Sequence, residues 1–482
     1  MAIPLGAAAH AKPASRHEVY PVPPGKVYTF HGRGYGHGHG MSQWGAYGAV
    51  KARHRTATQV LSFYYPHTTL RKFSARHKIR VLVSALSAPV RGYLEVEPAA
   101  GLTVKPVGAD PIALPTKTTN HHRISHWRLQ RNGSAIDLRD FAHGHWHTMQ
   151  SVGVKATFTD TAQELVVDRP GGTAGYRGAF AAVLRPSTFE AVNILPMDTY
   201  LRGVVAAEMP ASWPQQALQA QAIASRSYAW YEVKHPKASW FDVFGDTRDQ
   251  AYGGIGSENP RTTKAIDKTA GQVLVDSTKQ AIFAQFASAD GGWTVAGGQS
   301  YLPAKHDPYD GAVPNVEHAW TTSVPASTLQ SAYPSIGRLK NITITQRDGN
   351  GAWGGRVLGL TLNGDAGAVD LTGSDLQFAL GLRSPWFRPV PTPAAPRALK
   401  ASVAHRVLTV QWKAPHAGKG AAAVSGYRVR VSPDQRRKDV SATARQVSFG
   451  KLASGSHTVT LTALSSAGHS KAVSMVIKTG HK

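Results

Sequence analysis

One stretch of the sequence decides its fold class: Ile194-Leu195-Pro196-Met197-Asp198-Thr199-Tyr200-Leu201-Arg202-Gly203-Val204-Val205-Ala206-Ala207-Glu208-Met209-Pro210. The pattern turns helical at Asp198, which can cap a helix over residues 199–207. Glu208 stands where this helix stops, beside a proline and among apolar residues. Burial in such a place raises the pKa of a carboxyl group toward the range of a general acid. A glutamate that only caps or solvates a helix end fits the local residues equally well.

The neighbouring segments predict an α+β domain. Ser212-Trp213-Pro214-Gln215 has the form of a capping box with proline in the first turn, and it predicts a second helix that ends near Lys234. Residues 78–190 have mostly strand-like patterns, and residues 270–388 return to strands and loops. The sequence therefore predicts mixed strands with a helical active-site segment.

A second domain follows a proline-rich linker at residues 389–396. In residues 397–482 apolar and polar residues alternate in short runs separated by turn residues, which predicts an all-β immunoglobulin-like sandwich. Trp412 on an early strand, Tyr427 opening the next and Leu452 before the last hairpin resemble a fibronectin type III domain. His457 departs from that resemblance, since it stands where the family usually has the tyrosine of its corner motif. Another small sandwich would change the expected function little.

The charge of the chain indicates an anionic environment. The 482 residues include 54 Lys and Arg against 29 Asp and Glu, a net charge of +25. Residues 391–482 alone carry +13. Nucleic acid and the anionic polymers of a Gram-positive wall both attract such a surplus. No basic-aromatic array or helix-turn-helix pattern accompanies it, so we expect no nucleic-acid partner.

The beginning of the chain indicates export. Residues 1–28 are expected to be a signal-peptide remnant and disordered leader, because Ala9-His10-Ala11 has the form of a signal-peptidase site. An ordinary alanine-rich disordered terminus is the alternative. No apolar run approaches the ~18 residues that span a membrane, so no transmembrane anchor is expected. The chain has no cysteine, which excludes disulfides and thiolate metal sites.

The helical stretch, continued by Ala217-Leu218-Gln219-Ala220-Gln221-Ala222-Ile223-Ala224-Ser225-Arg226-Ser227-Tyr228-Ala229, resembles the signature of the SpoIID/LytB family. Further matches follow in order over most of residues 78–388: Asp249-Gln250-Ala251-Tyr252-Gly253-Gly254, Thr269-Ala270-Gly271-Gln272-Val273-Leu274, Phe286-Ala287-Ser288 with Gly291-Gly292, and Leu380-Gly381-Leu382-Arg383-Ser384. That family includes lytic transglycosylases of peptidoglycan. Its catalytic glutamate lies in a Glu-Met-Pro turn, so the resemblance implies that Glu208 is the catalytic residue.

A second motif stands near the start: His31-Gly32-Arg33-Gly34-Tyr35-Gly36-His37-Gly38-His39-Gly40-Met41-Ser42-Gln43-Trp44-Gly45-Ala46. It resembles the Gly-His-Gly-x-Gly-Met-Ser-Gln motif of the same family, which there comes last. A circular permutation explains the changed order, with residues 29–70 as the displaced segment and 78–388 as the main body of one catalytic domain, 29–388. The permutation predicts that His37, Ser42 and Gln43 pack against the groove that contains Glu208, as part of the substrate-binding site.

Histidines are frequent in this motif and in residues 116–147, but no other ligand type accompanies them at metal-site spacing. We therefore expect neither a metal nor another cofactor. Familiar zinc-binding members of the family use cysteines that this chain lacks.

The expected reaction follows from the number of carboxylates. Hydrolysis of a glycosidic bond usually needs two, yet none of Asp198, Asp246, Asp249 and Asp290 forms an obvious pair with Glu208. A lytic transglycosylase needs one. By resemblance, Glu208 would cleave the β-1,4 bond from N-acetylmuramic acid to N-acetylglucosamine and leave a 1,6-anhydro end.

Four polar residues are candidates for substrate binding, although each could equally be structural: Arg226, Tyr228, Gln250 and Tyr252. The expected partners are peptidoglycan glycan strands, anionic wall polymers and an amidase. The alternative function is that of a non-catalytic, secreted wall protein that enhances an N-acetylmuramoyl-L-alanine amidase.

Overall fold

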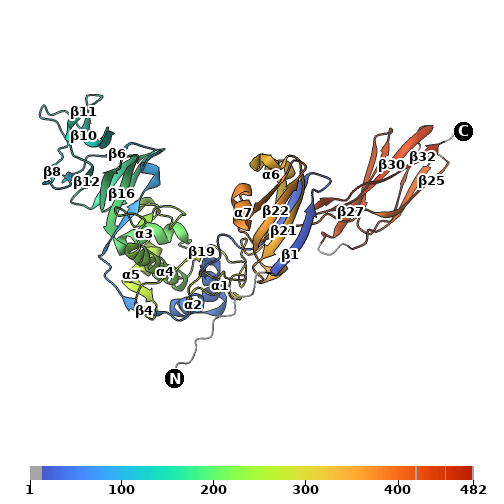
Figure 1. Ribbon diagram of the computed structural model, residues 1–482, viewed down its shortest axis with the longest axis horizontal. Helices are drawn as coiled ribbons and strands as arrows, with labels where there is room; N and C mark the ends of the chain where they lie inside the picture. The colour runs from blue at the N-terminus through green and yellow to red at the C-terminus, as the bar shows by residue number, and fades with distance from the viewer. Residues whose placement is uncertain (1–13, 406, 418–420, 451, 480–482) are drawn as a thin grey trace, which may run out of the picture.

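The computed structural model describes residues 14–405, 407–417, 421–450 and 452–479. The molecule is elongated: sheets and helices form one end, a smaller β-rich unit lies in the middle, and a sandwich forms the other end (Figure 1). The proposed signal remnant falls on residues 1–13, outside the described part. The expected leader is too long, because Ala14–Pro21 form strand β1 and pair with β21 (Leu339–Arg347). Backbone hydrogen bonding to a nine-residue strand orders this segment.

Two sheets pack face to face at the end of the molecule opposite the sandwich. The larger has the order β17 (Val243–Phe244), β5 (Lys78–Leu82), β16 (Phe189–Pro196), β15 (Ala179–Leu184), β12 (Lys155–Thr159), β7 (Thr103–Pro106) and β8 (Ile112–Ala113). The other has the order β11 (His145–Ser151), β10 (Ala135–Ala142), β9 (His126–Asn132), β6 (Tyr93–Val96), β13 (Glu164–Arg169) and β14 (Gly172–Arg177). Alternate residues of β10 are buried, as the period of a strand requires. Trp127, Phe158 and Phe180 share one core between the sheets.

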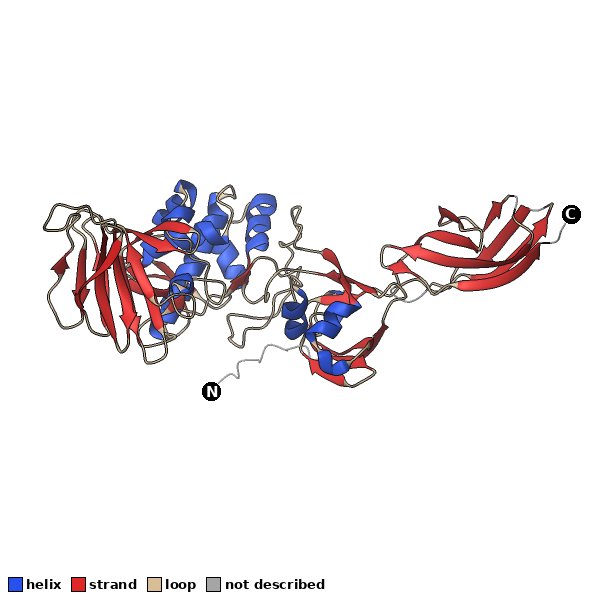
Figure 2. Cartoon of the chain, turned by 90° about the horizontal axis from the view of Figure 1, so that it is seen from above, coloured by secondary structure: helices blue, strands red, loops and turns tan. Residues whose placement is uncertain are grey.

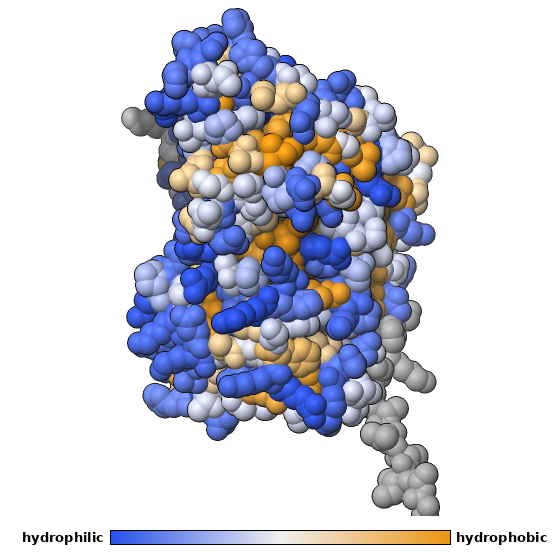
Figure 3. All heavy atoms as spheres, turned by 90° about the vertical axis from the view of Figure 1, so that its left-hand side faces the viewer, coloured by the Kyte–Doolittle hydropathy of each residue, from blue (hydrophilic) through white to orange (hydrophobic). Residues whose placement is uncertain are grey.

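The outer face of this end is mostly polar, and hydrophobic side chains show in a band across its upper half (Figure 3). The helices lie between these sheets and the middle unit (Figure 2). They are α1 (Gln43–Arg53), α2 (Ala57–Tyr64), α3 (Met197–Glu208), α4 (Gln215–Lys234) and α5 (Pro260–Lys268). Within the described residues, no helix combines the length and apolar character that crossing a membrane requires.

Both helices of the deciding stretch form, with different starts from those expected. Helix α3 begins at Met197 with Pro196 as its N-cap, so Asp198 lies in the first turn and not at the cap. Helix α4 ends at Lys234 as expected, but Pro214 is its N-cap and no side chain caps it. Ser212 lies too far upstream, because the helix begins only at Gln215, so the expected capping box is wrong.

Short strand pairs tie the displaced segment to the main body. β3 (Met41–Ser42) runs parallel to β19 (Phe286–Ala287), and β4 (Thr69–Lys72) pairs with β18 (Gln272–Val275). Helices α1 and α2 both pack on α4. The part of the displaced segment from Met41 to Lys72 therefore belongs to the same body as the helical stretch around Glu208.

The middle unit has its own hydrophobic core, which includes Phe30, Ile342 and Phe387. One sheet has the order β1, β21, β22 (Val357–Gly364) and β23 (Ala368–Leu371); another has β20 (Trp320–Pro325), β2 (Val27–Gly32) and β24 (Phe387–Pro389). Helices α6 (Ala326–Ala332) and α7 (Gly373–Leu380) pack here. Residues 29–388, expected as one domain, thus fold around more than one core.

The antiparallel pair of β2 and β24 joins the two ends of the predicted catalytic domain, with Gly32 opposite Phe387. In the motif order that the resemblance implies, β24 would come before β2 in the chain. Their adjacency is what a circular permutation requires, since cutting the chain between two such paired strands and joining the former ends preserves the fold.

The last unit is a sandwich of two sheets. One contains β25 (Arg397–Ala404), β26 (Val407–Lys413) and β29 (Gln446–Phe449); the other contains β27 (Val424–Ser432), β28 (Arg436–Ser441), β30 (Gly455–Ser465), β31 (Gly468–His469) and β32 (Val473–Thr479). Trp412 and Tyr427 pack in its core. His457 is buried, and its Nε2 lies 2.8 Å from the carbonyl oxygen of Ala453. The histidine thus makes the kind of side-chain to backbone bond that the corner tyrosine makes.

Candidate active site

Glu208 is the last residue of α3, and both of its carboxylate oxygens are held by the protein. The amide N–H of Ala251 donates to Oε1 at 2.7 Å, and Nε2 of Gln43 donates to Oε2 at 3.3 Å. Burial raises the pKa of Glu208 above its usual value, while these two hydrogen bonds act in the opposite direction. The net result is a half-buried carboxyl group that holds its proton to higher pH than a free glutamate.

The loop that supplies the Ala251 amide is anchored on both sides. The Asp249 carboxylate accepts hydrogen bonds from the Tyr228 hydroxyl at 2.6 Å and the Phe244 amide at 2.8 Å, and it pairs with Lys237 at 3.2 Å. The Gln250 side chain is fully buried and accepts from the Tyr200 hydroxyl at 3.1 Å. These contacts fix the backbone N–H of Ala251 toward Glu208.

Tyr252 packs behind the same helix. Its hydroxyl donates to Oδ1 of Asn193 at 2.7 Å, and its ring lies 5.2 Å from that of Tyr200. Gly203 makes room for this ring, because a Cβ there would lie 2.6 Å from it. Tyr228, Gln250 and Tyr252, expected as substrate-binding residues, therefore point their polar groups into the protein and position the loop.

Arg226 was also expected to bind substrate, and this expectation is wrong for the observed structure. Its side chain has 0% exposure and forms an ion pair with Asp198 at 2.6 Å. It also donates to the carbonyl oxygen of Gln272 at 3.2 Å. Helix α4 is surrounded on all sides, so a charged residue on it is buried and paired within the protein. Arg226 ties α3 to α4, and a substrate has no access to it.

The displaced motif reaches the site through the start of α1. The Ser42 hydroxyl is the N-cap and accepts from the Gly45 amide at 2.8 Å, which directs the next residue, Gln43, at Glu208. The contact that the permutation predicts between residues 165 positions apart is thus present for Gln43. Ser42 itself donates to Oδ1 of Asp310 at 2.7 Å and faces away from Glu208.

His37, the third expected residue of the motif, has other neighbours. Its Nδ1 accepts from the His39 amide at 2.9 Å, and the two imidazole rings lie 5.1 Å apart. No contact with Glu208 is present among the described residues. The structure therefore brings Gln43 to the glutamate and leaves His37 outside its immediate surroundings.

An aromatic cluster adjoins the site and was not expected from the sequence. The ring of Trp44, next to Gln43, lies 5.0 Å from that of Trp213, which follows Glu208 by five positions. Tyr47 stacks on Trp213 with ring centroids 4.7 Å apart. Trp44 and Tyr47 remain partly exposed. Trp44 follows Gln43 in one motif, and Trp213 follows Glu208 in the other. These positions were the sequence signal from which the cluster could have been predicted.

Each candidate for a second catalytic carboxylate is engaged elsewhere. Asp198 pairs with Arg226 and Asp249 anchors its loop, while Arg248 lowers the pKa of Asp246 to about 2. Asp290 is buried beside Asp307. In the described part of the chain, no other carboxylate shares a hydrogen bond with Glu208 or shifts its pKa. The same residues contain no group of three histidine, aspartate or glutamate side chains placed to hold a metal ion.

Two family models match the chain. Residues 185–275 match "SpoIID: Stage II sporulation protein", and residues 394–479 match the fibronectin type III domain. The first match includes α3 with Glu208, all of α4 and the Ala251 loop. The second coincides with the C-terminal sandwich.

Relatives match over parts of the chain. An uncharacterized protein of Brachyspira hyodysenteriae is 35% identical over 25% of this chain and 32% of its own length. The amidase enhancer of Bacillus subtilis is 34% identical over 27% of this chain and 18% of its own length. The stage II sporulation protein D of Bacillus amyloliquefaciens is 29% identical over 42% of this chain and 62% of its own length. The chain therefore spans less than two thirds of each relative.

Among solved structures, the fibronectin type III domain of human collagen alpha-1(XX) aligns with 22% identity and a TM-score of 0.17, covering 19% of this chain and 89% of that one. The sequence matches to the family models and to the named relatives agree with one another. Residues 185–275 of the chain are thus similar to the SpoIID family, and residues 394–479 are similar to fibronectin type III domains.

Proposed function

We propose that this protein is a lytic transglycosylase that cleaves the β-1,4 bond from N-acetylmuramic acid to N-acetylglucosamine in peptidoglycan. The observation that carries the proposal is the single carboxyl group of Glu208, raised in pKa by burial and held by Gln43 and Ala251. A carboxyl group whose pKa is raised keeps its proton to higher pH and is better suited to act as a general acid. The family match and the relative named stage II sporulation protein D are consistent with action in the cell wall.

In the proposed reaction, protonated Glu208 donates its proton to the oxygen of the departing N-acetylglucosamine as the bond to C1 of muramic acid breaks. The 6-hydroxyl oxygen of the same muramic acid then bonds to C1, and its proton passes to the Glu208 carboxylate. The product is a 1,6-anhydro end, and Glu208 regains its starting state. Water takes no part, so the mechanism does not call for a second carboxylate to activate it.

The Ala251 amide and the Gln43 side chain serve the second half of this cycle. Both stabilise the charged carboxylate that exists after proton donation. They therefore keep the pKa of Glu208 from rising so far that the group no longer releases its proton. The loop anchored by Asp249 holds one of these donors in place before substrate arrives.

The C-terminal domain is proposed to hold the enzyme at the wall. Its net charge of +13 over residues 391–482 attracts anionic wall polymers at long range. The same proposal places the protein outside the cell, secreted and associated with the wall.

A second candidate is a non-catalytic protein that enhances a wall amidase, because one relative carries the name amidase enhancer. Incubation of the purified protein with peptidoglycan separates the two. The transglycosylase produces anhydro-muropeptides with wild-type protein and none with Glu208→Gln. An enhancer releases no sugar product in either case, yet it accelerates an added N-acetylmuramoyl-L-alanine amidase equally with both proteins.

A further inference from the structure

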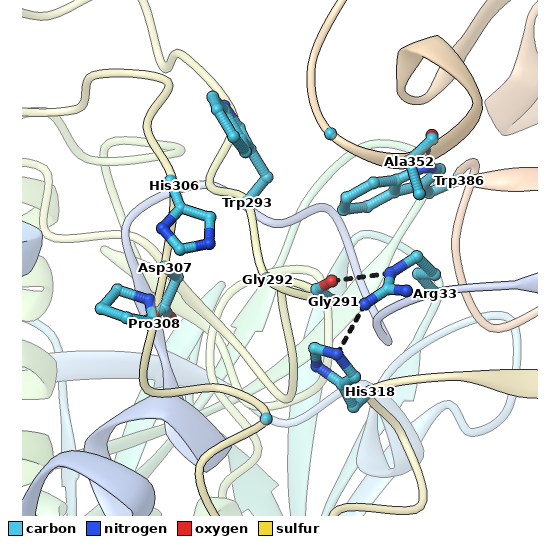
Figure 4. Close-up of a pocket in the computed structure, with 12 residues that line it drawn as sticks. Arg33, Gly291, Gly292, Trp293, His306, Asp307, Pro308, His318, Ala352 and Trp386 are labelled. Atoms are coloured by element: carbon cyan, nitrogen blue, oxygen red, sulfur yellow. Dashed lines mark hydrogen bonds between the residues drawn. The ribbon is translucent and has the colours of Figure 1, made fainter.

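A pocket that the proposed reaction does not use lies where the helical body meets the middle unit. Its volume is about 530 Å³, and residues from several separate segments line it, among them Arg33, Trp293, His306, His318 and Trp386 (Figure 4). Volumes of about 300–1,000 Å³ are usual for sites that take a small molecule. The backbone of Gly291 and Gly292 forms part of the wall, and both residues have positive φ.

The Arg33 guanidinium is fixed at one side of this pocket. Its Nε donates to the carbonyl oxygen of Gly291 at 3.0 Å, and its Nη2 lies 2.6 Å from Nε2 of His318 (Figure 4). Because a guanidinium only donates, Nε2 accepts and Nδ1 of His318 carries the proton. Nδ1 then donates to Oδ2 of Asp310 at 2.6 Å. His318 is neutral in this arrangement, and the positive charge stays on Arg33.

The third nitrogen of this guanidinium, Nη1, is available to a ligand. Within the described residues it forms no hydrogen bond, and Arg33 has no carboxylate within ion-pair distance. Asp307, the one carboxylate in the pocket wall, already accepts from the Tyr64 hydroxyl at 2.6 Å and the Tyr309 amide at 2.7 Å. The pocket therefore presents a fixed cation whose charge is not paired directly.

An aromatic wall stands across from this cation. Trp293 is partly exposed, and the His306 ring meets it at 65° with centroids 5.5 Å apart. Trp386 is buried beneath Arg33, whose guanidinium lies 5.6 Å from the indole centroid. An indole face packs against the C–H face of a sugar ring, while a guanidinium N–H donates a charge-assisted hydrogen bond to a carboxylate. Together they match a sugar that carries a carboxylate.

The pocket is also connected to the site of Glu208. Oδ1 of Asp310, whose other oxygen holds His318, accepts the Ser42 hydroxyl at 2.7 Å. Ser42 caps α1, and the next residue, Gln43, donates to Glu208. The first turn of α1 thus contacts both places, so the pocket belongs to the same body as the glutamate.

We propose that this pocket is a binding site for an acidic sugar of the wall, separate from the site of bond cleavage. The carboxylate of the sugar binds Nη1 of Arg33, and its ring packs on Trp293. The proposal rests on the proposed function for the choice of wall glycan as ligand. Muramic acid of a glycan strand that carries no stem peptide and a uronic acid of an acidic wall polysaccharide both supply this chemistry.

The test measures binding of monosaccharides to the full-length protein by titration calorimetry, with saturation-transfer NMR to detect weak complexes. N-acetylmuramic acid, glucuronic acid and N-acetylglucosamine are the three probes. We expect an acidic sugar to bind about tenfold or more tightly than N-acetylglucosamine, the effect of one hydrogen bond to a charged group. The acid that binds more tightly identifies the source. Equal binding of all three sugars, or no binding of any, overturns the proposal.

Variants assign the binding to the pocket. Arg33→Gln is expected to abolish the preference for an acid, while Trp293→Ala weakens binding of acidic and neutral sugars alike. Arg55→Gln, at an exposed arginine without a side-chain partner among the described residues, is the control and leaves binding unchanged. Circular dichroism checks folding. If Arg33→Gln is unfolded, Arg33→Lys keeps the charge but loses the bonds to Gly291 and His318 that hold the cation in place, and the preference must still fall. Retention of the preference in a folded Arg33 variant contradicts the proposal.

Glu208→Gln distinguishes this proposal from the proposed function. Because the pocket does not contain Glu208, the variant is expected to bind acidic sugars as wild type does. Cleavage by a protein that shows no preference for acidic sugars removes the pocket proposal and leaves the transglycosylase in place. If the protein binds acidic sugars but never cleaves glycan, the pocket proposal stands and the transglycosylase proposal fails.

Discussion

Replacing Gln43 by leucine removes the side-chain donor to Glu208 while it keeps a side chain of similar size. Gln43 donates to Oε2 at 3.3 Å and so favours the charged carboxylate. Its loss raises the pKa of Glu208 further, because burial is then opposed only by the Ala251 amide. A hydrogen bond to a charged group contributes about 1.5–3 kcal/mol, and the long distance favours the lower limit. Since 1.36 kcal/mol is a factor of ten, the protonation equilibrium moves about tenfold or slightly more.

The assay is the initial rate of glycan cleavage between pH 4 and 9. A general acid is active when protonated, so the alkaline limb of the Gln43→Leu profile is expected at higher pH than that of wild type. Gln299→Leu, at an exposed glutamine, is the control and leaves the limb in place. A limb that stays in place or moves to lower pH in Gln43→Leu refutes the reasoning, since it means that Gln43 does not stabilise the charged form. A lower rate at every pH without such a movement assigns Gln43 to substrate binding alone.

Three further outcomes follow from the same contacts. Native Glu208 keeps its proton to a pH above the usual pKa of 4.5, so the native state loses stability as pH rises from 4.5 through the raised pKa. In urea unfolding, Glu208→Gln is therefore expected to be more stable than wild type at pH 7 and equal to it at pH 4. A difference in stability that is larger at pH 4 than at pH 7 refutes this. Arg226→Leu leaves the Asp198 charge unpaired, and urea unfolding is expected to show a loss of about 3–5 kcal/mol with KM unchanged in the folded fraction; a raised KM at full stability contradicts the structural role. Removal of the chain after Pro396 is expected to weaken binding to whole walls and to reduce its salt dependence, measured by sedimentation at two ionic strengths, with cleavage of soluble strands unchanged; unaltered wall binding argues against the C-terminal domain as the anchor.

Local patterns were sufficient for much of the architecture. The end of α4 at Lys234, the proline-rich linker and the strands around Trp412 follow from periodicity and turn residues, which act over a few positions. The place of Gln43 beside Glu208 was predicted from the order of two family motifs, because a permuted chain must still bring both together.

Long-range burial explains what the sequence did not reveal. Arg226 lies on a helix that other elements surround, and Asp198 neutralises its charge from 28 positions away. The separate core of the middle unit depends on pairing of β2 with β24, more than 350 positions apart. Likewise, the hydrogen bonds from Arg33 through His318 to Asp310 join two segments that lie 285 positions apart, and no local pattern marks His318 or Asp310 as a partner of Arg33.

The origin of the oxygen at new glycan ends tests the central claim most directly. Peptidoglycan is digested in water enriched in ¹⁸O, and the released fragments are analysed by mass spectrometry. A single acid, Glu208, that uses the sugar's own 6-hydroxyl predicts anhydro ends without ¹⁸O, formed by wild type and not by Glu208→Gln. Reducing ends that carry ¹⁸O would contradict the account, because they require attack by water and a second group to activate it.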